Sequence, residues 1–127
     1  MKNLILTIIL SLSVFVTKAQ SIDINPKDTT IYNRVDIQPE YPGGFKALQN
    51  YLNSNIKPGD NKGMVIALFI IERDGKVSKI KIVKPLSQSA DKEAIRLIAG
   101  FPKFKPAIKD HKVVRCAFTM PIRFAKL

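Results

Sequence analysis

The feature that most constrains the fold is an almost continuous apolar run, MVIALFIIE, from Met64 to Glu72. It is rich in branched residues and short for a buried helix, which is typical of a strand buried on both faces. The dipeptide Asp74–Gly75 that follows favours a tight hairpin turn. Residues 76–84 then alternate isoleucine with lysine, as a return strand does. The hairpin therefore places the apolar run at the centre of a small sheet.

The C-terminal stretch HKVVRCAFTMPIRF, from His111 to Phe124, predicts a third strand. Its even-numbered residues from position 114 onward are all apolar, which is the period-two pattern of a half-buried strand. Pro121 lies inside this pattern, and proline has no N–H to donate to a neighbouring strand. We therefore expect this strand at one edge of the sheet. The outward lysines of residues 76–84 indicate the opposite edge.

Two amphipathic helices are predicted. The first covers FKALQNYLNSNI, and its apolar residues recur at helical spacing at Phe45, Leu48, Leu52 and Ile56. The second covers SADKEAIRLIAG, with Ser89 as its expected N-cap and Gly100 at its end. The segment 103–110, KFKPAIKD, is expected to be a basic loop.

These elements predict an α+β fold in the order α-β-β-α-β. Its sheet has three antiparallel strands in the order 2-1-3, a right-handed crossover leads into the last strand, and both helices cover one face. Backbone groups of successive strand residues point to opposite lateral sides. We expect Pro121 to face the free side, and with it Arg115, Ala117 and Thr119.

An open strand edge has two readings. It can be kept free for another chain, which adds a strand through backbone hydrogen bonds. It can instead be guarded against pairing by Pro121 and the neighbouring arginines. The strand pattern favours neither.

The N-terminal residues predict export. Lys2 precedes the apolar run 4–16 and the small-residue pattern 17–19, which together are typical of a signal peptide over residues 1–19. The alternative is an uncleaved inner-membrane anchor that faces the periplasm. Residues 20–36 are expected to be a linker with a short extended piece near residues 34–37, and residues 37–127 the domain. The expected location is the periplasm.

The charge of the chain limits its partners. It carries 21 Lys and Arg against 10 Asp and Glu, a formal net charge of +11, which favours anionic partners. A basic stripe could suit nucleic acid, but export and the absence of stacking aromatics among the expected exposed sheet positions argue against it. We expect no nucleic-acid partner. Binding to anionic envelope components, or to another envelope protein without energy transduction, remains an alternative.

The sequence offers little to an enzyme. His111 is the single histidine and Cys116 the single cysteine, so no converging set of metal ligands is expected. Asp91 and Glu93 are two residues apart on a helix and do not face each other. We expect no catalytic residue, no metal and no cofactor, and we expect Cys116 to be a buried, inert thiol.

Four segments together resemble the C-terminal domain of TonB-type energy transducers: QPEYPGGFKAL, GMVIALFIIERDGKVSKIKIVKP, DKEAIRLIAGFPKFKPA and VVRCAFTMPIRF. The resemblance covers about residues 37–125. Its most specific pieces are QPEYP, DGKV and FPKFKPA. The form with Gly43–Gly44 is similar to variants common in Bacteroidetes-type bacteria.

The resemblance implies a periplasmic domain that grips the TonB box of an outer-membrane TonB-dependent transporter by strand addition in energy-coupled transport. By position, the partner contact falls on two segments. The first is Gln38, Pro39, Glu40, Tyr41 and Pro42; the second, within the last strand, includes Val113, Arg115, Ala117, Thr119 and Pro121. A structural turn is the alternative for Tyr41 and Pro42. A homodimer paired through its own edges also stays open.

Two features depart from a complete transducer. The apolar run 4–16 contains no ionisable residue that would couple to a proton-driven motor, and the linker 20–36 is short. The chain therefore looks like a stand-alone TonB-type domain. The sequence identifies neither the partner nor whether the leader is cleaved.

Overall fold

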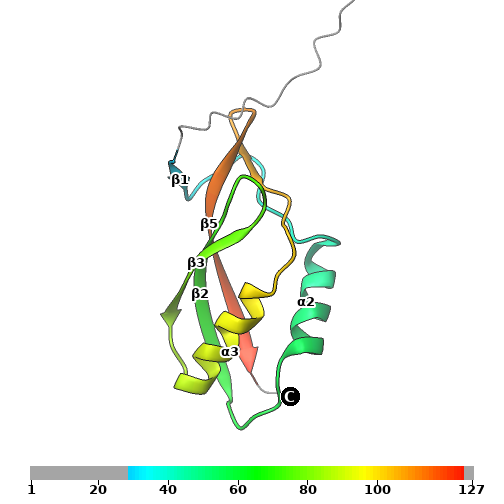
Figure 1. Ribbon diagram of the computed structural model, residues 1–127, viewed down its shortest axis with the longest axis vertical. Coiled ribbons are helices and arrows are strands. Elements are labelled where there is room, and N and C mark those ends of the chain that lie inside the picture. The colour runs from blue at the N-terminus through cyan, green and yellow to red at the C-terminus, as the bar shows by residue number, and fades with distance from the viewer. Residues whose placement is uncertain (1–28, 125–127) are drawn as a thin grey trace, which may run out of the picture.

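The computed structural model describes residues 29–124. Within them lie two helices and five strands (Figure 1). The expected signal peptide at residues 1–19 lies outside the described residues. The elements in chain order are β1 (Ile31–Tyr32), α2 (Gly44–Asn55), β2 (Gly63–Ile71), β3 (Val77–Lys84), α3 (Gln88–Ala99), β4 (Ala107–Lys109) and β5 (Lys112–Phe124).

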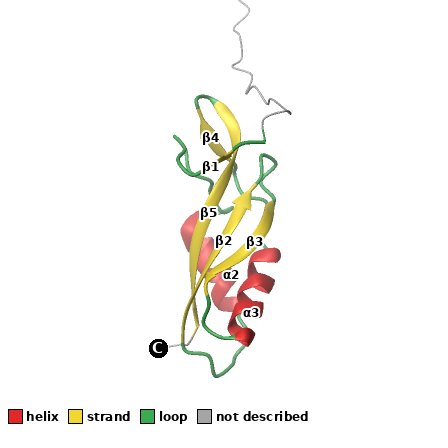
Figure 2. Cartoon of the chain, turned by 90° about the vertical axis from the view of Figure 1, so that its left-hand side faces the viewer, coloured by secondary structure: helices red, strands yellow, loops and turns green. Residues whose placement is uncertain are grey.

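The centre of the sheet follows the sequence prediction. β2 lies between β3 and β5 and is antiparallel to both. Pro121 lies opposite Ile66 on β2. Figure 2 shows α2 behind the strands and α3 beside β3, and both helices bury residues in one core against the same side of β2, so α2 and α3 cover the same face of the sheet. The expected order 2-1-3 is therefore correct for these three strands.

The expectation of a three-stranded, wholly antiparallel sheet is wrong. The sheet is mixed and has five strands, because two short strands join β5. β1 runs parallel to β5, with Ile31 opposite Arg115 and Tyr32 opposite Cys116. β4 forms an antiparallel hairpin with β5, opposite residues 112–114. Both additions come from segments expected to be irregular, the linker 20–36 and the basic loop 103–110.

The core lies between the sheet and the helices. Alternate residues of β2, such as Val65, Ala67 and Phe69, are fully buried. They meet the even-numbered residues of β5 and the inner faces of α2 and α3. One end of this core is aromatic: Tyr41, Tyr51, Phe69, Phe101, Phe104 and Phe118 have neighbouring ring centroids 5.3–6.4 Å apart.

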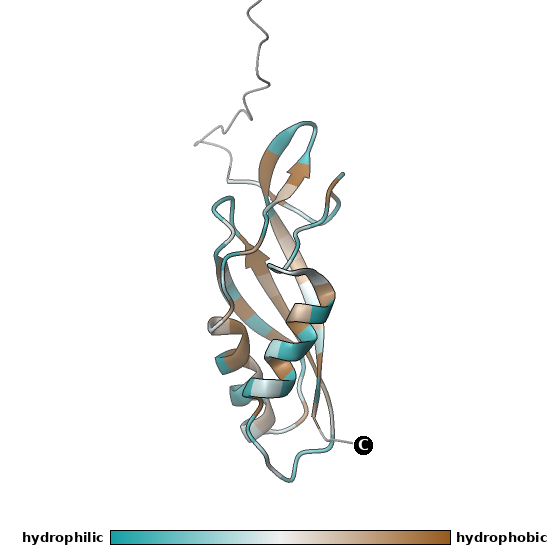
Figure 3. Cartoon of the chain, turned by 90° about the vertical axis from the view of Figure 1, so that its right-hand side faces the viewer, coloured by the Kyte–Doolittle hydropathy of each residue, from teal (hydrophilic) through white to brown (hydrophobic). Residues whose placement is uncertain are grey.

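Two details of the helices differ from the sequence prediction. The N-cap of α3 is Ser87 rather than Ser89: its hydroxyl accepts a hydrogen bond from the Ala90 N–H at 3.1 Å. On α2, Leu48 is buried, but Phe45 is 75% exposed. Phe45 therefore does not belong to the core. Figure 3, which faces the helices, shows the alternation of hydrophobic and hydrophilic residues along both.

The β2–β3 turn depends on one glycine. Gly75 has φ +86° and donates its N–H to the Glu72 carbonyl at 2.9 Å. Its own carbonyl accepts the Phe104 N–H at 2.9 Å. The turn therefore also anchors the chain that leads into β4.

Candidate functional site

The outer flank of β5 is the candidate binding site. β2 pairs with β5 from Cys116 to Phe124, and β1 occupies the opposite flank only at Arg115 and Cys116. Within the described residues, no strand pairs with the outer flank of residues 117–124. This edge, which we call the open edge, extends about 26 Å at about 3.3 Å per residue. It is long enough to accept a short extended peptide.

The structure separates the expected contact residues of β5 into two groups. Ala117, Thr119 and Pro121 lie on the open edge. Val113 lies opposite Ile108 of β4, and Arg115 lies opposite Ile31 of β1. The expectation that the flank is free as far back as Arg115 is therefore wrong, because the chain's own N-terminal strand covers it there.

The other expected contact segment, residues 38–42, is part of the domain's own framework. Glu40 and Lys105 exchange two backbone hydrogen bonds of 3.0 and 2.8 Å. Pro39 and Tyr41 are buried, whereas Gln38, Glu40 and Pro42 are exposed. The ring of Tyr41 packs edge-on to Phe104, with centroids 5.5 Å apart. A partner therefore has access to the exposed residues of this segment but not to the Tyr41 ring.

The opposite edge of the sheet is built differently. The β2–β3 register shifts twice, between Ile66 and Ala67 and between Leu68 and Ile70. Lys79 at one of these irregularities has φ +50° and is exposed, as are Lys81 and Lys84. Bulges and lysines are the usual means of preventing strand pairing. β3 is thus a protected edge, and the open edge of β5 is the better template for an added strand.

A charged cluster holds β1 beside Arg115 and Cys116, at the end of the open edge where residue 117 lies; we call this its upper end. Arg115 forms an ion pair with Glu72 and donates a hydrogen bond from Nη1 to the Thr29 carbonyl at 2.8 Å. Behind β1, Tyr32 packs against a small apolar cluster that contains Cys116. Burial raises the pKa of the Cys116 thiol, which keeps it protonated and unreactive. These contacts set the point at which the open edge begins.

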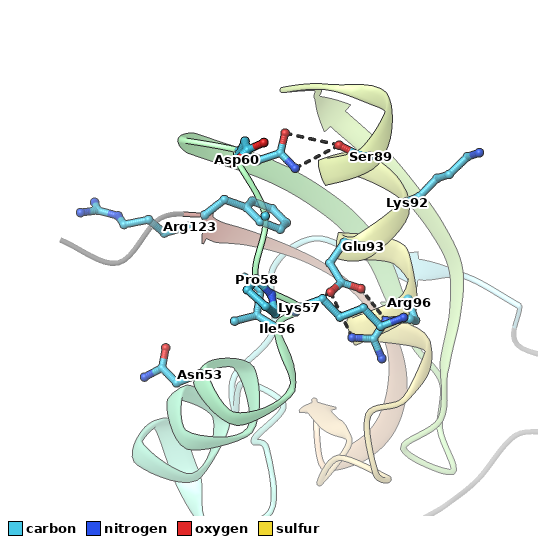
Figure 4. A pocket seen from close by; sticks show the side chains of 13 residues that line it. Asn53, Ile56, Lys57, Pro58, Asp60, Ser89, Lys92, Glu93, Arg96 and Arg123 are labelled. Atoms are coloured by element: carbon cyan, nitrogen blue, oxygen red, sulfur yellow. Dashed lines mark hydrogen bonds and ion pairs between the residues drawn. The ribbon is translucent and has the colours of Figure 1, made fainter.

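A cavity of about 870 Å³ lies beside the lower end of β5. Figure 4 shows that it is bounded by the end of α2, the loop after it, α3 and Arg123. Glu93 and Arg96 form an ion pair in it; Glu93 also accepts the Lys57 N–H at 2.7 Å, and Arg96 Nη2 donates to the Asn55 carbonyl at 2.7 Å. These groups tie α3 to the end of α2, so their role is structural.

The Glu93 link predicts a pH dependence of stability. The hydrogen bond from Arg96 and the bond from Lys57 lower the pKa of Glu93 below its ordinary value of 4.5. Because the pKa of Glu93 is lower in the folded state than in the unfolded chain, its ionised form stabilises the fold at a pH above the ordinary pKa. This stabilisation is lost as the pH falls toward the pKa of the folded state. We expect urea unfolding of Glu93→Gln to show a weaker loss of stability below about pH 4.5. Asp60→Asn, a carboxylate of the same cavity, is the control that should keep the wild-type slope.

No group of three or more His, Cys, Asp or Glu side chains in the described residues could hold a metal ion. Among residues 29–124, no helix is long and apolar enough to cross a membrane. The backbone edge of β5 is the feature from which binding can be argued.

Sequence reasoning located the open edge, and its alternative of a structural turn for Tyr41 and Pro42 agrees with the packing of Tyr41. It missed β1 and the backbone pairing of Glu40 with Lys105. A pair of residues such as Ile31–Tyr32 has no periodicity to detect. In the sequence, the polar residues Gln38 and Glu40 alternate with Pro39 and Tyr41, which the structure buries. That polar–apolar alternation was the available signal for an extended, half-buried segment.

One family model matches more than half of the chain. The sequence model of the family described as Gram-negative bacterial TonB protein C-terminal matches residues 57–125. Two solution structures of the TonB C-terminal domain from Helicobacter pylori are similar. The first has 23% identity and a TM-score of 0.47, and the match covers 63% of this chain and 90% of that one. The second has 21% identity and a TM-score of 0.40, with 63% and 79% covered. No curated protein matches the chain.

Proposed function

The chain belongs to the family of Gram-negative bacterial TonB C-terminal domains, and from this we propose that it binds a periplasmic segment of an outer-membrane transporter by strand addition to β5. The observation that carries the proposal is the open edge, residues 117–124, beside a β3 edge that is bulged and lined with lysines. The family implies a TonB-like role in envelope transport. The mode of contact and the partner are our proposal.

Backbone direction decides whether the open edge can act as a template. Pro121 has no N–H, and the ladder with β2 is continuous across the Ile66–Pro121 pair. The arrangement that costs no hydrogen bond puts the backbone of Pro121 on the outer flank. Alternation then puts the N–H groups of Ala117, Thr119 and Arg123 on the same flank. The N–H of Ala117 adjoins the β1 pairing at Arg115 and Cys116, so the donors that an added strand would find are those of Thr119 and Arg123.

Hydrogen exchange tests this arrangement in the protein alone. We expect the amides of Thr119 and Arg123 to exchange fast, because water is their partner, and those of Phe118, Met120 and Ile122 to exchange at least tenfold more slowly. Residue-resolved NMR measures both sets in one sample. Slow exchange at Thr119 in the monomer would show that the register is wrong. Slow exchange that appears only at high concentration would indicate edge-paired homodimers.

A second measurement tests the partner. Synthetic peptides of the N-terminal segments of TonB-dependent transporters from the same genome are titrated into the labelled protein. We expect the amides of residues 117–123 to shift and to become protected. Binding through backbone hydrogen bonds should change little between 50 and 300 mM salt, whereas binding to the general basic surface should weaken steeply. A steep salt dependence without protection would favour the alternative of an exported basic module for anionic envelope components.

Location and anchoring belong to the same proposal. We propose that residues 1–19 direct export and that the domain acts in the periplasm. Mass determination of the N-terminus of the protein from cells tests this: a chain beginning at Gln20 or Ser21 supports cleavage and a released domain. An intact Met1 supports the alternative of a domain anchored by residues 4–16.

A further inference from the structure

The face of the sheet turned away from the helices is apolar along its centre. Met64, Ile66 and Leu68 of β2 point to this side, since their neighbours Val65 and Ala67 are buried under the helices. Residues opposite one another on antiparallel strands share a face, so Thr119 and Pro121 of β5 lie beside Leu68 and Ile66. Figure 2 looks directly onto this face and shows neither helix over it. We call the row Met64, Ile66 and Leu68 the apolar row.

Cations border the apolar row on both sides. On β3, Lys81 lies opposite Leu68 and Lys84 opposite Ile66. On β5, Arg123 lies opposite Met64. All three are exposed, and no ion pair within the described residues neutralises them. The carboxylate nearest to this face along β2 is Glu72, which Arg115 already neutralises.

From this juxtaposition we propose that the helix-free face is a second docking surface, and that its occupant is an acidic amphipathic helix of a partner protein. The apolar row spans about 13 Å, which corresponds to about nine residues of helix at 1.5 Å per residue. A helix with apolar residues on one side and Glu or Asp along its flanks would cover the row and neutralise the cations. This surface is distinct from the open edge of β5.

Charge decides against a second copy of this chain as the occupant. Two such faces packed together would bring Lys81, Lys84 and Arg123 of one copy toward the same residues of the other, and like charges at close range destabilise an interface. The net charge of +11 adds repulsion at longer range.

The small exposed apolar area argues against a lipid surface. Membrane binding scales with the apolar area that enters the bilayer. Met64, Ile66 and Leu68 are only partly exposed and lie along a sheet rather than on a protruding element. The apolar row therefore offers little area to insert, whereas a helix can cover it where it lies.

The test uses designed helical peptides of about 18 residues. One has leucine on one side and glutamate on the other, the second replaces each glutamate with lysine, and the third replaces each leucine with serine. We expect the first peptide to bind at least tenfold more tightly than the other two by fluorescence anisotropy, with NMR shifts at residues 64–68 and 81–84. The double variant Lys81→Glu, Lys84→Glu should weaken binding of the leucine–glutamate peptide at least tenfold. The matched double variant Lys57→Glu, Lys92→Glu, on the cavity beside α3, should not.

Three results would overturn the proposal. Equal binding of the leucine–glutamate and serine–glutamate peptides would show attraction to net charge alone. Shifts confined to the cavity residues would place the site beside α3. Binding of vesicles of phosphatidylglycerol that Lys81→Glu, Lys84→Glu abolishes, without binding of any peptide, would assign the face to lipid. Leu68→Gln gives an independent check, since it removes apolar surface without changing charge and should also weaken the leucine–glutamate peptide.

Discussion

Replacing Thr119 with proline is expected to weaken transporter-peptide binding about 30-fold while leaving the domain folded. The substitution removes one outward N–H in the middle of the open edge, next to the gap that Pro121 already creates. The facing carbonyl of the added strand would lose its hydrogen bond and stay poorly solvated, a loss of about 2 kcal/mol. Isothermal titration with a transporter peptide measures the effect.

The same variant separates the two possible registers. If the Thr119 N–H points outward, unfolding in urea changes little, because the ladder with β2 keeps all its bonds. Should it point to β2 instead, Thr119→Pro would break an internal hydrogen bond and lower stability markedly. Thr119→Val is the matched control: it keeps the backbone donor and should bind as the wild type does. Equal weakening by both variants would assign the effect to the side chain and contradict strand addition.

Replacing Gly75 with alanine is expected to have the largest effect on stability, a loss of roughly 3 kcal/mol. A Cβ at this position would lie 2.1 Å from the Phe104 carbonyl oxygen, and the backbone φ of +86° is one that L side chains rarely adopt. Neither the turn nor the chain before β4 can move freely, because the Gly75 carbonyl accepts the Phe104 N–H. Urea unfolding monitored by circular dichroism measures the loss.

Gly59→Ala is the control for the Gly75 substitution. Its added Cβ would have no neighbour nearer than 3.9 Å, at Asn61, so its stability should stay within about 0.5 kcal/mol of the wild type. If Gly75→Ala lowers the free energy of unfolding no more than Gly59→Ala does, the β2–β3 turn and the segment before β4 can move apart at little energetic cost. The framework that positions the upper end of β5 would then be weaker than the structure indicates.

The sequence predicted those elements whose pattern is repeated often enough to be recognised. The branched apolar run 64–72 became the central strand, and Asp74–Gly75 became its turn. Pro121 correctly placed β5 beside only one long partner. Each of these signals is local, since alternation, turn chemistry and the missing N–H of proline act within a few residues of the chain.

The misses have a common physical cause. Ser87 and Ser89 are both chemically able to cap α3, and Ser87 is selected in the fold, where its hydroxyl also donates to Asn61 at 2.7 Å. Phe45 follows the helical spacing of α2, yet the helix turns it to solvent. In both cases packing against distant residues chose between options that are locally equivalent.

For this protein, then, the amino-acid sequence by itself determined the three-stranded centre, the helices and the pairing of β5 with only one long strand, β2, which leaves its outer edge without a second long partner. Only the tertiary structure decided how much of that edge is open. Ile31–Tyr32 closes it as far as Cys116, and two bulges with Lys79 protect the other edge. The reason is that a two-residue strand or a register shift gains its hydrogen bonds only from a partner already in place, and such a partner is invisible in a local pattern.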